Sequence, residues 1–224
     1  GNSSRAAEVQ KVVTGTRLLD FAAWQRGDVK DFKKSEHELV RAVAQAQGNR
    51  RNAMRLMLVR FYLARGMGVE AFGVLNALLG AKPKLIENRD VRVLRGVAQY
   101  MIGHYVEAVE DLEHPSLKKN VEIYPWRAGI ASARGDWAGA YRLMEDIDPI
   151  FLGYPTKIAV KFGLLAAEAA MAVDDYRVGT ARMDALGKFA MTKNDLDYVA
   201  FLRGHILKRK DKNDAALALW YNVV

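Results

Sequence analysis

The sequence contains no cysteine, and this absence excludes disulfide bonds, thiolate zinc sites, iron–sulfur clusters and cysteine nucleophiles. It leaves the compartment open between cytoplasm and periplasm. Long hydrophobic runs are also missing, because no stretch approaches the roughly 18 uncharged apolar residues that a membrane-spanning helix needs. Nothing at the start of the chain resembles a signal peptide. We therefore expect no membrane span in this segment.

Proline is scarce, with five residues in 224, and each proline falls between two stretches of helical composition. The five are Pro83, Pro115, Pro125, Pro149 and Pro155. Proline removes an amide donor and clashes inside a helix, so it is typical of junctions. The stretches between the junctions are rich in Ala, Leu, Met, Arg and Glu and show no sustained period-two alternation. The sequence therefore predicts an all-α protein.

Motifs for catalysis and cofactor binding are absent as well. Residues 66–71 match the dinucleotide fingerprint GxGxxA, but they follow FYLAR, which has a helical composition, whereas the fingerprint must follow a strand. The acidic group Glu145, Asp146 and Asp148 stands at a helix end before a proline, which is typical of a solvated terminus. We expect no enzymatic activity and no cofactor.

Metal ligands are not grouped either. The four histidines, His37, His104, His114 and His205, are scattered, with no HExxH motif and no second histidine one helical turn away. We expect no metal site.

What the chain does contain is a recurring spacing around six turn positions, Gly27, Gly66, Gly103, Gly135, Asp174 and Asp211. For the last five turns, a small residue follows after five positions, namely Ala71, Ala108, Ala140, Gly179 and Ala216. A large apolar residue follows after nine, namely Leu75, Leu112, Met144, Met183 and Trp220. A residue no larger than valine precedes each turn by seven, namely Val59, Gly96, Ala128, Ala167 and Gly204. The turns are 39, 37, 32, 39 and 37 residues apart, close to one helical hairpin each.

Helix packing explains this choice of residue types. Two antiparallel helices of about four turns, packed roughly 8–10 Å apart, need a small side chain on each helix where they cross most closely. A large apolar residue one turn further on then fills the space beside the crossing. The spacing therefore predicts an array of about six helical hairpins.

The residues from Gly66 to Pro83 resemble the second half of a tetratricopeptide repeat, with a glycine at the turn followed by Ala71, Leu75 and Leu78. The stretch from Gly135 is similar. The chain thus resembles divergent tetratricopeptide proteins, of a bacterial kind, over about residues 50–224. The resemblance implies a right-handed α-solenoid with a concave groove that binds proteins. Intervals other than the family's 34 residues, and Asp20 and Phe32 at positions where small residues are expected, are departures from the pattern.

The resemblance also places the groove on the first helix of each hairpin. The partner-binding residues that it implies are Leu56, Arg60, Leu63, Val93, Val97, Tyr100, Ser132, Leu164, Glu168, Met171, Tyr198, Phe201, His205 and Lys208, with Gly129 beside Ser132. These residues are largely apolar, and they do not reproduce the lysine, arginine and asparagine clamp of chaperone-binding members. A peptide or helix of another protein, with hydrophobic anchors, is therefore the expected guest.

Two alternatives remain open at this stage. An RNA-binding helical-repeat protein would suit the net charge of +8, but equivalent sites in the hairpins do not repeat a polar pair. The basic residues are also dispersed among acidic ones, in groups at Arg50, Arg51 and Arg55, at Lys118 and Lys119, and around residues 208–212. The second alternative is a substrate-docking arm of a larger enzyme.

The sequence suggests boundaries at both ends of the chain. We expect a tag remnant or disordered start in residues 1–4, an N-terminal helical pair acting as a cap in residues 5–48, and five hairpins in residues 49–224, truncated at the C-terminal end. Near that end a stripe formed by Ala216, Leu219, Trp220 and Val223 recurs at helical spacing. Either a further helix or a second copy of the chain covers the stripe by self-association, or Trp220 packs inside its own hairpin against Gly204 and Leu207.

Overall fold

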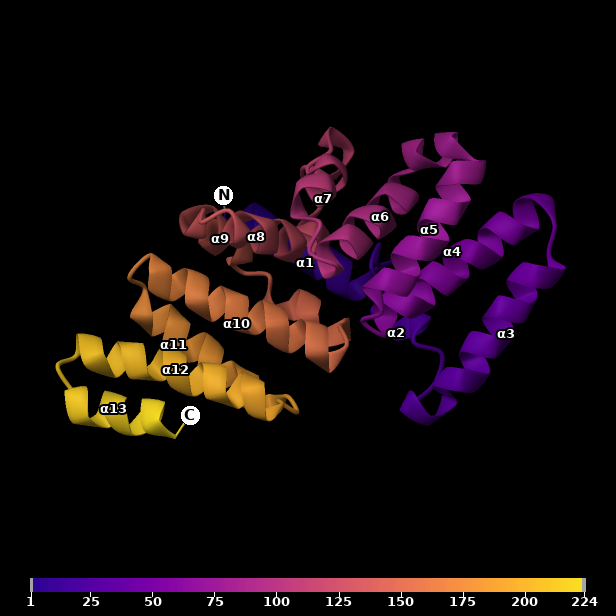
Figure 1. Cartoon of the computed structure of the whole chain (residues 1–224). Coiled ribbons are helices and arrows are strands. Elements are labelled where there is room, and N and C mark those ends of the chain that lie inside the picture. The colour runs from indigo at the N-terminus through magenta and orange to yellow at the C-terminus, as the bar shows by residue number, and fades with distance from the viewer. Residues whose placement is uncertain (1, 223–224) are drawn as a thin grey trace. The chain divides into compact units, whose positions relative to one another are not determined.

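A computed structural model describes residues 2–222, and this part of the chain contains thirteen α-helices (Figure 1). They belong to two compact units. Unit 1 comprises Gly1–Ile130 and Asp146–Pro155, and unit 2 comprises Ala131–Glu145 and Thr156–Val224. The all-α class predicted from the sequence is confirmed.

Unit 1 holds seven complete helices and most of an eighth, together with short 3-10 turns. The helices are α1 (Asn2–Thr14), α2 (Phe21–Trp24), α3 (Phe32–Gln45), α4 (Gly48–Ala64), α5 (Gly68–Ala81), α6 (Arg89–Met101), α7 (Tyr105–Leu112) and α8 (Tyr124–Ala133), whose last three residues fall in unit 2. The 3-10 turns are η1 (Val29–Asp31), η2 (Pro83–Glu87), η3 (Pro115–Leu117), η4 (Val121–Ile123) and η5 (Asp148–Gly153). From α3 to α7 each helix packs against the next one in the chain.

Unit 2 repeats the same local arrangement. Its helices are α9 (Trp137–Met144), α10 (Thr156–Ala172), α11 (Tyr176–Ala185), α12 (Lys193–Arg209) and α13 (Asn213–Tyr221), with the 3-10 turn η6 (Leu186–Lys188) after α11. The closest pairs are α10 with α11 and α12 with α13. Helices packed as sequential pairs, in both units, are the arrangement that the recurring spacing predicts.

The turns of the hairpins lie where the sequence places them. All six predicted turn residues have positive φ, between 57° at Asp211 and 85° at Gly27. At each of the last five turns, the amide of the residue after the turn residue donates to the carbonyl five positions earlier. At Gly66, for example, the amide of Met67 donates to the carbonyl of Tyr62 at 2.9 Å. This six-residue closure is the Schellman motif, which needs a left-handed residue at the turn. Glycine supplies that conformation without strain, and aspartate tolerates it.

The small residues around the last five turns are buried, as the crossing model requires. Ala71, Ala108 and Ala140 are fully inaccessible to solvent. A methyl group added at Gly96 of α6 would lie 2.6 Å from Cγ of Leu112 on α7. At Gly204 the same addition would meet the indole of Trp220. Helices in these pairs approach so closely that larger side chains have no room.

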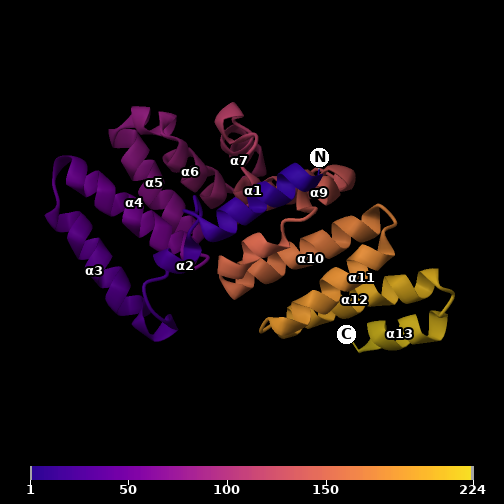
Figure 2. The same cartoon turned by 180° about the vertical axis from the view of Figure 1, so that it is seen from behind.

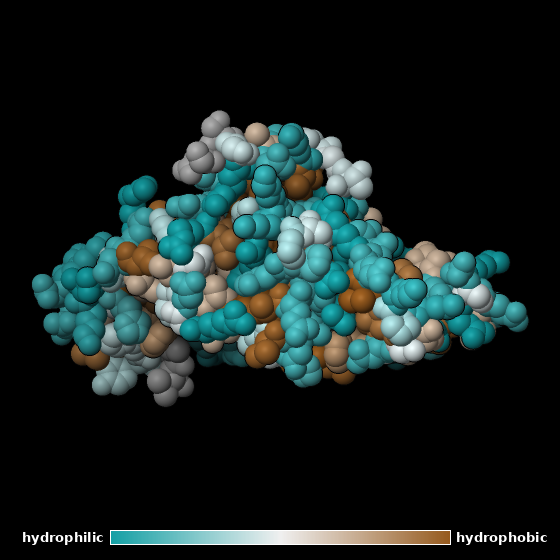
Figure 3. All heavy atoms as spheres, turned by 90° about the horizontal axis from the view of Figure 1, so that it is seen from above, coloured by the Kyte–Doolittle hydropathy of each residue, from teal (hydrophilic) through white to brown (hydrophobic). Residues whose placement is uncertain are grey.

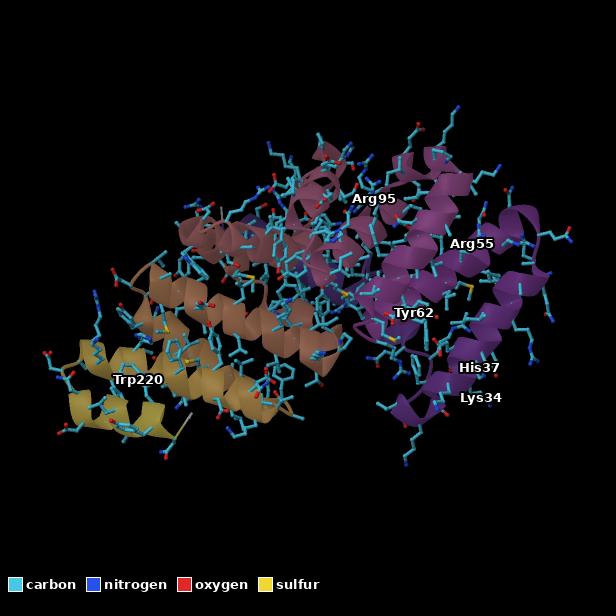
Figure 4. All side chains as sticks on the ribbon, viewed as in Figure 1. Lys34, His37, Arg55, Tyr62, Arg95 and Trp220 are labelled. Atoms are coloured by element: carbon cyan, nitrogen blue, oxygen red, sulfur yellow. The ribbon has the colours of Figure 1, made fainter. Side chains whose placement is uncertain are left out.

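A buried charge cluster joins α6 to α7. The carboxylate of Asp111 is fully buried and accepts hydrogen bonds from Nε of Arg95 at 2.6 Å, from Nη2 of Arg95 at 2.9 Å and from Nη1 of Arg92 at 3.2 Å. The bond to Asp111 raises the pKa of the Arg95 guanidinium further above its usual value. Arg95 on α6 is therefore the partner of a buried acid on α7 (Figure 4).

The beginning of the chain differs from the expected helical pair. Residues 5–48 contain parts of four helices: most of α1, all of α2 and α3, and the first residue of α4. Asn2, which the sequence assigns to a tag remnant or disordered start, begins α1, and Gly1 lies outside the described residues. Between α1 and α2 the chain is not helical, and its buried residue Leu19 is held by contacts far away in the sequence. No helix within residues 2–222 is long and apolar enough to span a membrane.

Candidate peptide-binding surface

A hollow of about 570 Å³ opens on unit 2 beside the C-terminal ends of α10 and α12. Its lining comprises Trp137, Glu168, Met171, Ala172, Tyr176, Phe201, Leu202, His205, Lys208 and Arg209. The floor belongs to the core of the unit, in which Leu164, Ala167 and Leu202 are buried together. The hollow is thus an apolar basin with a polar rim, which is the usual composition of a binding site for a side-chain anchor.

Aromatic rings form one continuous row along α12 and onto α13. The rings of Tyr198 and Phe201 are stacked at 6.1 Å, and those of Phe201 and His205 meet edge to face at 4.6 Å. His205 in turn lies 5.2 Å from the ring of Trp220. Phe201 remains 42% exposed although it lines the hollow. An exposed phenyl ring held by neighbouring rings is a preorganised anchor point, because binding immobilises little further side-chain freedom.

The polar rim is held by internal contacts. Asp174 accepts a hydrogen bond from the Tyr176 hydroxyl at 2.7 Å and lies 3.0 Å from the guanidinium of Arg209. The hydrogen bond to Asp174 raises the pKa of Tyr176. Across the basin, burial followed by a hydrogen bond to Glu168 raises the pKa of Tyr198. Both tyrosines therefore remain protonated near neutral pH, and Lys208 contributes a positive charge at the edge.

Five of the predicted groove residues meet in this hollow. They are Glu168, Met171, Phe201, His205 and Lys208. Tyr198 lies beside Phe201, whereas Leu164 is buried below in the core and Ser132 is half-buried in α8. The structure therefore brings together the predicted residues from two neighbouring first helices, α10 and α12.

The predicted groove residues of unit 1 have different surroundings. Leu63, Val93, Val97 and Tyr100 are buried, and the ring of Tyr100 packs on Gly129. Leu56 and Arg60 are half-buried. Residues 17–24, which we call the strap, lie on this side of unit 1, because α2 packs against α4 and the Arg60 guanidinium lies over the Trp24 ring. Seen from behind, α2 lies beside α4, with α1 leading into it (Figure 2).

The sequence interpretation did not single out Trp137, Ala172, Tyr176, Leu202 or Arg209 as lining residues. A signal for two of them exists in the repeat. Trp137 follows the turn residue Gly135 by two positions, and Tyr176 follows Asp174 by two. Aromatic residues at equivalent positions of successive hairpins lie at equivalent places in the fold. The shared spacing from the turn therefore indicates that the rings of Trp137 and Tyr176 lie near each other.

Among the described residues, no three His, Asp or Glu side chains lie close enough to hold a metal ion. His104 meets the ring of Phe72, and His114 contacts the hydroxyl of Ser116 at 2.9 Å. The face of the molecule in Figure 3 carries hydrophilic side chains interrupted by small separate hydrophobic patches.

Trp220 packs inside its own hairpin, as one of the two alternatives for the C-terminal stripe states. Its indole lies against Gly204 and donates to the carbonyl of Phe201 at 3.1 Å (Figure 4). Ala216 is buried, while Leu219 is half-buried, and Val223 lies outside the described residues. Self-association through this helix stays a prediction.

No protein-family model matches this chain, and comparisons with curated proteins and with solved structures found no match either.

Proposed function

We propose that this chain is a protein-interaction module of the tetratricopeptide-like solenoid class, which binds a peptide or helix of a partner protein. The observation that carries the proposal is the hollow of unit 2. Five residues predicted to bind a partner, from two successive first helices, line one apolar basin with an exposed phenyl ring. Sequential helix pairs support the solenoid assignment, because stacked hairpins present their first helices on a common side.

The preferred guest carries a hydrophobic anchor residue on an amphipathic helix or an extended segment. The basin offers rings and a thioether, namely Trp137, Phe201 and Met171, which suit a large apolar side chain. The rim offers Lys208 and Glu168, so both signs of charge are available beside the anchor. A mixed rim around an apolar centre is the usual anatomy of a protein interface.

Affinity capture from cells of the source organism, with the full chain as bait, tests the proposal. Phe201→Glu places a charge in the basin and should reduce the retained partner by at least about 30-fold, the effect of losing about 2 kcal/mol at a hot spot. Leu217→Glu is the matched control, because Leu217 is 47% exposed on α13 but does not line the hollow. Circular dichroism verifies that both variants are folded.

The outcomes of the capture experiment distinguish a protein-interaction module from an RNA-binding protein. A partner retained by wild type and by Leu217→Glu, but lost with Phe201→Glu, supports the module. Equal retention by all three chains contradicts it. Retention that disappears after nuclease treatment, together with tight RNA binding at physiological salt, would favour the RNA-binding alternative.

A further inference from the structure

The strap is held on unit 1 by contacts that recognise backbone as well as side chains. The carboxylate of Glu122, in the 3-10 turn η4, accepts the amide protons of Leu18 at 2.8 Å and of Leu19 at 3.0 Å. Glu122 is itself 3% exposed. A buried carboxylate aimed at two consecutive N–H groups binds any extended segment that presents such a pair, because amide protons carry no sequence information.

Side-chain selection comes from an aromatic pocket next to this carboxylate. Phe21 is fully buried, with its ring 4.8 Å from Tyr154 and 6.1 Å from Trp126. Trp24, one helical turn later, packs edge to face on Phe21 and lies under the guanidinium of Arg60. Proteins recognise peptides by binding backbone amides and by holding one aromatic side chain in a pocket. Here the chain uses the same two kinds of contact to hold its own strap.

Space for an incoming segment lies beside the strap. A hollow of about 530 Å³ is bordered by Arg17, Leu18 and Trp24 of the strap and by Arg60 and Glu122. Among the described residues, Nε of Arg60 is buried without a hydrogen-bond acceptor. A buried donor without a partner is costly, and an acceptor from a bound segment would satisfy it.

The strap is attached to the rest of unit 1 on both sides. On the N-terminal side, α1 packs against η4 and η5, and Val9 is the only buried side chain among those described in α1. On the C-terminal side, Nη2 of Arg65 donates to the carbonyls of Gln25 at 2.6 Å and of Gly27 at 2.8 Å. The second attachment keeps the strap beside its site at an effective concentration on the order of millimolar.

We propose that the first-helix side of unit 1 is a peptide-binding groove occupied by the strap, and that a partner segment of the same chemistry exchanges with the strap. That chemistry is an extended pair of apolar residues with free amide protons, an aromatic anchor two residues after the pair, and an acceptor for Arg60. This groove is separate from the hollow of unit 2, so the proposal does not depend on the function assigned to that hollow.

A fluorescent peptide spanning residues 15–26, titrated into the full chain, tests the exchange. Phe21→Ala removes the anchor of the attached strap and leaves the anchor of the peptide intact. We expect this variant to bind the peptide at least about tenfold more tightly than wild type, because the competing strap is weakened. Leu75→Ala is the matched control, because Leu75 is an equally buried side chain of unit 1 that lies on α5, whereas α2 packs against α4. It should leave peptide binding at the wild-type level.

A second measurement does not require the Phe21→Ala variant to fold. The chain has no cysteine, so a single Leu19→Cys substitution provides a buried thiol whose modification rate reports release of the strap. Saturating peptide should accelerate modification at least about tenfold, whereas a peptide with alanine in place of its phenylalanine should not. Leu75→Cys, equally buried in α5, is the control and should not respond.

The results decide between exchange and a permanent strap. Failure of a folded Phe21→Ala variant to bind the peptide overturns the proposal, and so does a thiol modification rate at Leu19→Cys that the peptide leaves unchanged. A wild-type dimer that Phe21→Ala converts to monomer would assign the groove to the strap of a second copy, and would overturn the assignment to a partner protein.

Discussion

Replacing Asp111 with asparagine tests the buried charge cluster between α6 and α7. The side chain keeps its shape, but the two guanidinium groups lose their counter-charge. Three hydrogen bonds to a charged group are weakened, each worth about 1.5–3 kcal/mol. The side chains of Arg92 and Arg95 are 17% and 25% exposed, so water recovers part of this loss. We expect a net loss of about 3 kcal/mol in the free energy of unfolding, near the lower end for a broken buried pair.

Urea denaturation followed by far-ultraviolet circular dichroism measures this loss, and the melting temperature should fall by about 6–12 °C. Asp184→Asn is the control, because Asp184 pairs with Arg203 at 2.6 Å but the two side chains are 59% and 46% exposed. The control should cost no more than about 1 kcal/mol. Equal losses for the two variants, or a loss below about 0.5 kcal/mol for Asp111→Asn, would refute the argument from burial.

Two further predictions concern a helix crossing and a buried tyrosine. Ala140→Leu should overpack α9, because Ala140 is fully buried, and it should cost about 1–3 kcal/mol in a urea melt, whereas Ala138→Leu on the exposed side of α9 should be nearly neutral. Burial, followed by a hydrogen bond from the Tyr62 hydroxyl to Glu36 at 3.0 Å, raises the pKa of Tyr62 to about 12. Above pH 10 the unfolded chain releases this proton and the folded chain retains it, so stability should fall more steeply between pH 10 and 12 in wild type than in Tyr62→Phe, and parallel curves would contradict this.

The hairpins could be predicted from the sequence because their determinants are local. A turn residue with positive φ and small residues at fixed offsets, such as Gly96 and Ala108, describe two helices that are neighbours in the chain. The repeated spacing of these residues is therefore enough to predict the helix pairs. The same repeat places Phe201 and His205 on one side of α12, where they line the hollow.

The strap could not be predicted in this way. Leu18, Leu19 and Phe21 form a short apolar run without a helical or an alternating period, and their binding sites lie more than 100 positions away at Glu122 and Trp126. Asp20 contradicts the small-residue rule because it caps α2, accepting from the amide of Ala23 at 3.1 Å. The pattern of a single sequence contains no signal that pairs such distant residues.

The distant contacts of the strap determine the order in which unit 1 can be completed during synthesis. The Arg17 guanidinium donates to the carbonyl of Ile150, 133 residues later in the chain. At about 5–20 residues per second, a ribosome needs roughly 7–27 s to make this intervening stretch. The hairpins from α3 to α7 consist of local contacts that can form as they emerge. The strap, although it is translated before these hairpins, reaches its final position in unit 1 after them, and its leucine and phenylalanine side chains remain accessible to chaperones throughout that interval.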